Sequence, residues 1–167
     1  MNRIFLNSSF FLIIAGACSF LNAQNNPEDY QTQLYQLVNQ QRSTGCTCGK
    51  IKYPPVKPLQ RNEKLESAAS NQAITLAKTD ILSHQGDDGS NVRSRLDMAH
   101  YEWKAYSENI AQGYEYPEDV FSAWIQSPGH CKNIMGNYSD FGVAKEGQYW
   151  VMDFATPKMQ VTSSEVK

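Results

Sequence analysis

The chain has 167 residues, of which 41% are hydrophobic and 19% charged, and its formal net charge at neutral pH is −2. This length and composition are typical of one globular domain with enough apolar side chains to form a core. The near balance of charges leaves no broad basic surface, which argues against a nucleic-acid-binding protein.

The first 23 residues have the features of an export signal. Arg3 is their only charge, and the apolar run 10–17 is too short to span a bilayer as a stable anchor. Small residues ending at Ala23 fit a cleavage site, so we expect residues 1–23 to be removed and the protein to be secreted or periplasmic rather than transmembrane. Lipoprotein processing at Cys18 is the alternative to cleavage after Ala23, because a run of small residues precedes this cysteine.

Removal of this segment would leave three cysteines, Cys46, Cys48 and Cys131. In an oxidising compartment two of them can pair while the third is left over. A bridge between Cys46 and Cys48 is unfavourable because only one residue separates them, so one of the two is expected to pair with Cys131. A zinc site made of all three thiols is the alternative, although Cys-x-Cys lacks the usual two-residue spacing.

Helical periodicity predicts four helices, at residues 29–43, 62–80, 90–99 and 117–127. Asn62 fits the N-cap of the second helix and Ser90 that of the third. Pro-Gly at 128–129 is expected to end the fourth helix and turn the chain. Residues 46–58 contain three prolines and two cysteines without any period, so they are expected to form a loop.

Two-residue alternation predicts three strands, at residues 103–111, 141–144 and 148–155. The pair 146–147 fits a hairpin turn between the last two. In the first strand, Tyr106, Glu108 and Ile110 share one half-buried face, and a carboxylate on such a face needs a partner. This order of elements predicts an α+β fold: a small, mostly antiparallel sheet covered by helices.

The residues that can carry chemistry are His84 and His130, which are both expected in loops beside glycines. Together with Glu108 they can form a three-ligand zinc-type site with an open fourth position. If such a site activated a metal-bound water, Glu108 and His130 would be the residues of a metal-dependent peptide or ester hydrolase. No serine lies in a Gly-x-Ser-x-Gly elbow, and Cys131 is a poor nucleophile if it is bridged.

Four motifs follow one another along the chain: Ser-His-Gln-Gly at 83–86, Ser-Glu-Asn-Ile-Ala-Gln-Gly at 107–113, Ala-Trp-Ile-Gln-Ser-Pro-Gly-His at 123–130 and Tyr-Trp-Val-Met-Asp-Phe at 149–154. In this order they resemble the CAP superfamily of cysteine-rich secretory, antigen 5 and pathogenesis-related proteins, and most closely its bacterial single-domain branch. The resemblance implies a three-layer α-β-α sandwich. We place this CAP (SCP-like) domain at residues 30–156, followed by a flexible tail at 157–167.

The resemblance also implies a cleft in which two histidines and two glutamates hold a divalent cation. His84, Glu108 and His130 match three of these positions, whereas Ser127 stands near the place of the second glutamate. We therefore expect Zn²⁺ or another divalent cation to bind weakly.

Bacterial relatives that carry Cys-Gly in the early loop also carry a cysteine after the second histidine. Cys48-Gly49 and Cys131 match this pattern. The resemblance therefore implies a disulfide between Cys48 and Cys131, with Cys46 left over.

The family does not imply a single activity, because one fold carries many functions. We expect a monomeric, secreted module for ligand binding or envelope interaction, whose cleft takes a small hydrophobic, peptide or glycan ligand. A metal-dependent hydrolase is the alternative. The serine near the second glutamate position, Ser127, favours binding over enzyme activity.

Overall fold

The computed structural model describes residues 27–159, so the predicted export signal with Cys18 and residues 160–167 of the predicted tail lie outside the described part. Its elements are α1 Pro27–Thr44, β1 Cys46–Cys48, β2 Ile51–Tyr53, β3 Gln60–Arg61, α2 Glu63–Thr79, α3 Val92–Met98, β4 Trp103–Gln112, α4 Pro117–Gln126, α5 Pro128–Ile134, β5 Asp140–Glu146 and β6 Tyr149–Pro157. Within residues 27–159, no helix has both the length and the hydropathy needed to cross a membrane.

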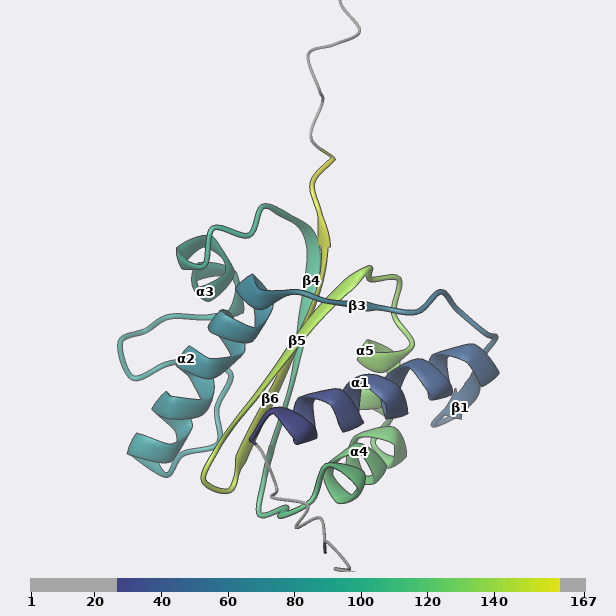
Figure 1. The fold of residues 1–167 in the computed structure, drawn as a ribbon, viewed down its shortest axis with the longest axis horizontal. Helices are drawn as coiled ribbons and strands as arrows, with labels where there is room; N and C mark the ends of the chain where they lie inside the picture. The colour runs from purple at the N-terminus through teal and green to yellow at the C-terminus, as the bar shows by residue number, and fades with distance from the viewer. Residues whose placement is uncertain (1–26, 160–167) are drawn as a thin grey trace, which may run out of the picture.

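The elements form three layers, as Figure 1 shows. Helices α2 and α3 cover one face of the main sheet, and α1, α4 and α5 cover the other. The predicted α+β class and the three-layer α-β-α arrangement are therefore confirmed.

The main sheet has four strands in the order β3-β5-β6-β4, which makes β4 an edge strand. Strands β4 and β5 both pair antiparallel with β6, and the short β3 runs parallel to β5. The predicted small, mostly antiparallel sheet is confirmed. The hairpin turn lies one residue later than predicted, because Glu146 already pairs with Tyr149 and Gly147 takes the left-handed φ of +54° that glycine tolerates.

Alternating residues of β5 and β6 pack into two different cores. On the side of α1, α4 and α5 the sheet contributes Phe141, Trp150 and Phe154 to a core that also holds Trp124. On the side of α2 it contributes Ala144 and Val151, which pack against buried residues of that helix. Both faces of the sheet are therefore covered, and β6 is buried over most of its length.

The predicted start of α2 is confirmed, because the Asn62 side chain accepts a hydrogen bond from the backbone nitrogen of Lys64 at 3.0 Å. The start of α3 lies one residue later than predicted. Its N-cap is Asn91, not Ser90, and Asn91 forms a reciprocal capping box with Ser94.

Two other segments differ from the prediction. Residues 46–58 are not a loop throughout, since β1 and β2 pair in an antiparallel hairpin whose strands, three residues each, are too short to show a period. The fourth helix ends near the predicted place, but Pro128 then begins a further helix, α5, at the first helical position that proline favours. His130 therefore lies on a helix and not in a loop.

A buried arginine joins α1 to the segment before β3 and to the end of α5. Arg42 donates to the backbone oxygens of Lys57, Ile134 and Gly136 at 2.8, 2.7 and 2.9 Å. Burial lowers the pKa of this guanidinium to about 10. Because Ile134 is the last residue of α5, Arg42 holds the end of the helix that carries His130.

Gly142 lies where α2 packs on β5. A Cβ added there would be 2.1 Å from the backbone nitrogen of Glu66 and 2.3 Å from the backbone carbon of Leu65. Main-chain atoms cannot move aside as a flexible side chain does, so we expect Gly142→Ala to lower the free energy of unfolding by about 1–3 kcal/mol or more in urea denaturation.

Gly129→Ala is the matched control, because a Cβ at Gly129 meets nothing within 4 Å and alanine favours the helix. Its free energy of unfolding should be unchanged or slightly higher. An unchanged value for Gly142→Ala would contradict the close approach of α2 to the sheet.

Candidate functional site

The loop after α2 presents His84 to the edge of the sheet. The buried side chain of Gln72, on α2, donates to the backbone oxygen of Ser83 at 2.6 Å. The hydroxyl of Ser83 accepts from the backbone nitrogen of Gln85 at 3.0 Å. These bonds hold the backbone on both sides of His84, while its side chain remains 56% exposed.

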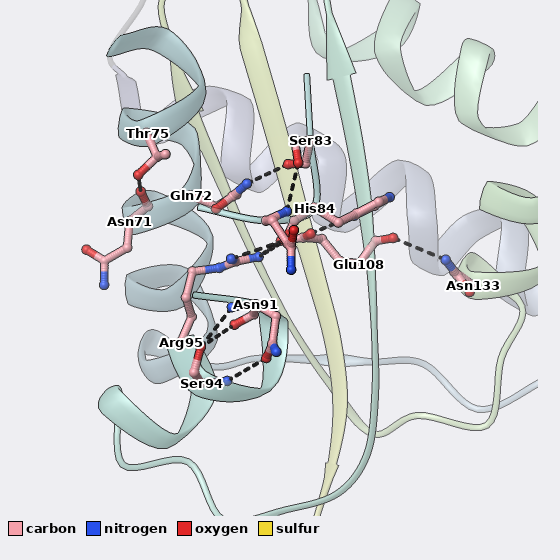
Figure 2. A network of polar contacts seen from close by, with 11 residues as sticks. Asn71, Gln72, Thr75, Ser83, His84, Asn91, Ser94, Arg95, Glu108 and Asn133 are labelled. Carbon is pink, nitrogen blue, oxygen red and sulfur yellow. Dashed lines mark hydrogen bonds and ion pairs between the residues drawn. The ribbon is translucent and has the colours of Figure 1, made fainter. Parts of the chain in front are cut away.

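Glu108 points from β4 into the layer of α2 and α3, where its side chain is only 1% exposed. Its Oε1 lies 2.7 Å from His84 Nδ1 and its Oε2 lies 2.6 Å from Arg95 Nη2 (Figure 2). The prediction that this carboxylate has a partner is therefore confirmed, since it contacts both His84 and Arg95. A carboxylate can only accept, so Nδ1 of His84 is the nitrogen that carries the proton.

Arg95 is a further residue of the site, which was not predicted from the sequence. It lies on α3, is 1% exposed, and also approaches the backbone oxygen of His84 at 3.4 Å. One signal was present: Val92 and Leu96 define the inward face of α3, and a residue three positions after Val92 falls on that face. An arginine there indicates a buried partner of opposite charge.

Asp153 is a second buried carboxyl group beside Glu108, because the two residues are paired across β4 and β6. Its side chain is fully buried, and neither oxygen has a hydrogen-bond partner among the described residues. Burial, followed by the charge of Glu108, raises the pKa of Asp153 well above its ordinary 3.8. The neutral form of Asp153 is therefore favoured, and Arg95 is the cation that faces Glu108.

His130 comes to the same edge strand from α5, on the other side of the sheet. Asn109 donates to the backbone oxygen of His130 at 3.2 Å. Asn133 donates to Asn109 Oδ1 at 2.8 Å and lies 3.3 Å from the backbone oxygen of Glu108. The two asparagines therefore hold α5 against β4.

Of the predicted ligands, the structure brings His84 and Glu108 into contact and leaves His130 apart from them. Within residues 27–159, the only three His, Cys, Asp or Glu side chains whose donor atoms all lie within 4.8 Å of one another are Cys46, Cys48 and Cys131. The donor atoms of His84, Glu108 and His130 therefore do not surround a common metal position in this conformation.

Ser127, which stands near the predicted place of a second glutamate, occupies the junction between α4 and α5. It is the C-cap of the first helix and the N-cap of the second, and its side chain makes no capping hydrogen bond. The junction therefore carries a hydroxyl group and not a carboxylate.

The predicted disulfide is confirmed, because Cys48 and Cys131 are bonded and link β1 to α5 across 83 residues. Cys46 is the free cysteine of the described residues. Zinc binding through thiolates needs unbonded, deprotonated sulfurs. The alternative zinc site of three thiols is therefore excluded while the bridge is intact.

The two histidines are expected to titrate in opposite directions. The hydrogen bond to Glu108 raises the pKa of His84 above its ordinary 6.5, and burial opposes this shift. Burial, followed by the charge of His84, lowers the pKa of His130 below 6.5. An NMR titration of the metal-free protein should therefore give His84 the higher pKa, relative to both His130 and the unfolded chain.

The sign of the effect on stability follows from linkage. Because the folded pKa of His84 is raised, the stability from its protonated form is complete below the unfolded pKa of 6.5 and is lost as pH rises through the folded pKa. Equal pKa values for His84 and His130 would contradict the contact with Glu108.

Removing the charge of Arg95 tests whether it holds Glu108. Arg95→Met would leave a buried carboxylate without a cation, so we expect a loss of about 3–5 kcal/mol in the free energy of unfolding. Arg93→Met is the matched control on the same helix, because Arg93 is 64% exposed and pairs with Asp97 only at 3.8 Å; its loss should stay below about 1 kcal/mol. Equal losses for the two variants would refute the role of Arg95.

The arrangement described above has counterparts among known proteins. The model of the cysteine-rich secretory protein family, CAP, matches residues 35–154. This range includes His84, Glu108, His130 and both bridged cysteines.

Two curated relatives share part of the sequence. YkwD, an uncharacterized protein of Bacillus subtilis strain 168, is 27% identical over 136 residues, which cover 80% of this chain and 49% of YkwD. YlbC, an uncharacterized membrane protein of the same organism, is 23% identical over 97 residues, which cover 58% of this chain and 28% of YlbC. The chain thus spans half or less of the length of these relatives.

Solved structures share the fold. An extracellular protein of Bacillus anthracis that contains an SCP domain superposes with a TM-score of 0.70 at 18% identity, over 78% of this chain and 41% of that protein. An outer surface protein of Borrelia burgdorferi superposes with a TM-score of 0.65 at 19% identity, over 80% of this chain and 96% of that protein. Since the family model matches most of the described residues, this chain belongs to the cysteine-rich secretory protein (CAP) family.

Proposed function

We propose that this protein is an exported CAP-domain binding module whose ligand site is formed around His84 and His130. The export signal expected at residues 1–23 supports secretion. Structural relatives that are extracellular or on the outer surface point the same way. The Cys48–Cys131 disulfide also favours an oxidising compartment.

The hydrogen bond between His84 Nδ1 and Glu108 Oε1 is the observation that carries this proposal. It leaves Nε2 as the free nitrogen of a side chain that is 56% exposed. Carboxylates commonly orient metal-binding histidines through the ring nitrogen that does not bind the metal. Glu108 would then act as a positioning residue, because its other oxygen is held by Arg95.

This donor set fits a weakly held divalent cation, with zinc as the first choice. The lowered pKa of His130 favours the neutral imidazole that coordination requires. His84 must release its extra proton before it binds a cation, so the affinity should decrease as pH falls. Ser127 supplies no carboxylate, so water would complete the coordination, and a bound cation would offer that position to a ligand donor.

The same contacts favour binding over hydrolysis. A general base needs a carboxylate oxygen that can accept a proton from the attacking water. The Glu108 side chain is only 1% exposed and its two oxygens face His84 and Arg95, so an attacking water has little access to either oxygen. A small hydrophobic, peptide or glycan molecule remains the expected class of ligand.

Zinc titration by calorimetry tests the cation site. We expect weak binding at a single site in the wild type, and a loss of at least about tenfold in affinity in both His130→Ala and His84→Gln. Removing a residue that only hydrogen-bonds to a metal ligand already has an effect of about this size. His100→Asn is the matched control, because His100 is exposed between α3 and β4 and its φ of +55° suits asparagine. Equal heats from the wild type and His130→Ala would overturn the proposal.

A further inference from the structure

We propose that Cys46 is a thiol–disulfide exchange site. Its thiolate attacks the buried Cys48–Cys131 bridge and forms a new disulfide, which an exterior dithiol can then reduce. The proposal concerns the sulfur cluster between β1 and α5 and does not depend on the cation site.

Cys46 is in contact with both atoms of the bridge. Its Sγ lies 3.5 Å from Cys131 Sγ and 3.7 Å from Cys48 Sγ. The strand explains this placement, because residues two apart on β1 point to the same face, so Cys46 and Cys48 both face α5. The hairpin turn is close to α5 as well, since a Cβ at Gly49 would lie 3.2 Å from the Pro128 side chain.

The three sulfurs differ in their access to solvent. Cys131 is 0% exposed and Cys48 is 4% exposed, so an exterior thiol cannot reach the bridge while the fold is closed. Cys46 is only half-buried. The one reduced sulfur of the cluster is therefore also the one that an exterior molecule can reach.

The exchange is redox-neutral and needs no further reactant. The Cys46 thiolate attacks Cys131 Sγ, a Cys46–Cys131 bond forms, the Cys48–Cys131 bond breaks, and its electron pair leaves on Cys48, which takes up a proton. Cys131 is the target because its sulfur is nearer and because a bridge within Cys-x-Cys is geometrically unfavourable. Cys46 lies beside the bridge and not in line with it, so in-line attack requires β1 to shift relative to α5 as well as a rotation of the Cys46 side chain.

An exterior dithiol then completes the reduction. One of its thiolates attacks the half-buried Cys46 sulfur, which breaks the Cys46–Cys131 bond and leaves the electron pair on Cys131. The second thiolate of the dithiol displaces Cys46 and closes a cyclic disulfide. The dithiol loses two electrons, and Cys48 and Cys131 both end as thiols.

The test is the rate at which dithiothreitol reduces the bridge in the native protein, followed by alkylation and mass spectrometry. The full chain carries Cys18→Ser, so that Cys46 is the only thiol of the oxidised protein. Mildly alkaline buffer is used because burial raises the pKa of Cys46. We expect Cys46→Ser to slow reduction by at least about tenfold, because attack must then wait for the buried bridge to become exposed.

Two controls separate exchange from a change in stability. Alkylating Cys46 with iodoacetamide before the assay leaves the sequence unchanged and should slow reduction as Cys46→Ser does. Cys48→Ser should form a Cys46–Cys131 disulfide in air and be reduced faster than the parent chain, because one of its bridged sulfurs is half-buried. Reduction of Cys46→Ser at a rate within about twofold of the parent chain would overturn the proposal, since the bridge would then open without Cys46.

Discussion

Arg95 and Glu108 lie 2.6 Å apart, and each side chain is 1% exposed. Taking each charge out of water costs several kcal/mol, which their attraction offsets only in good geometry. The pair therefore requires one placement of α3 relative to β4. The loop that carries His84 depends on the same two residues, because Glu108 holds its imidazole and Arg95 approaches its backbone oxygen. Burial of Asp153 in the same layer raises its pKa, which favours the neutral carboxyl group beside the Arg95–Glu108 pair.

The edge strand β4 joins two halves of the site that come from opposite layers. Its alternation directs Glu108 toward α3 and the His84 loop, and the next residue, Asn109, toward α5. Since β4 has a neighbour on one side only, its free edge is where these layers can both contribute side chains. The disulfide from β1 and the Arg42 contacts hold α5 from its other side, which limits how far His130 can move.

The sequence predicted those features that depend on one periodic segment. Alternation placed Glu108 on a half-buried face, and the cap at Asn62 marked the start of α2. The helix α5 was not predicted, because Pro-Gly is typical both of a turn and of the start of a helix. Arg95 was not predicted as a site residue, because the helical spacing of α3 indicates that it faces inward but does not identify Glu108, in another element, as its partner. The pairing of Cys48 with Cys131 came from family resemblance, since spacing alone left Cys46 as an equal partner.

The tautomer of His84 is the most direct test of how the site is organised. If Glu108 fixes the imidazole through Nδ1, the neutral ring carries its proton on Nδ1 and presents Nε2 as the free donor. Long-range ¹H–¹⁵N NMR of the metal-free protein, at a pH above the pKa of His84, distinguishes the two nitrogens. We expect the Nδ1–H form. A predominant Nε2–H form would show that Glu108 does not orient His84, and the site would then lack the donor on which the proposed cation binding rests.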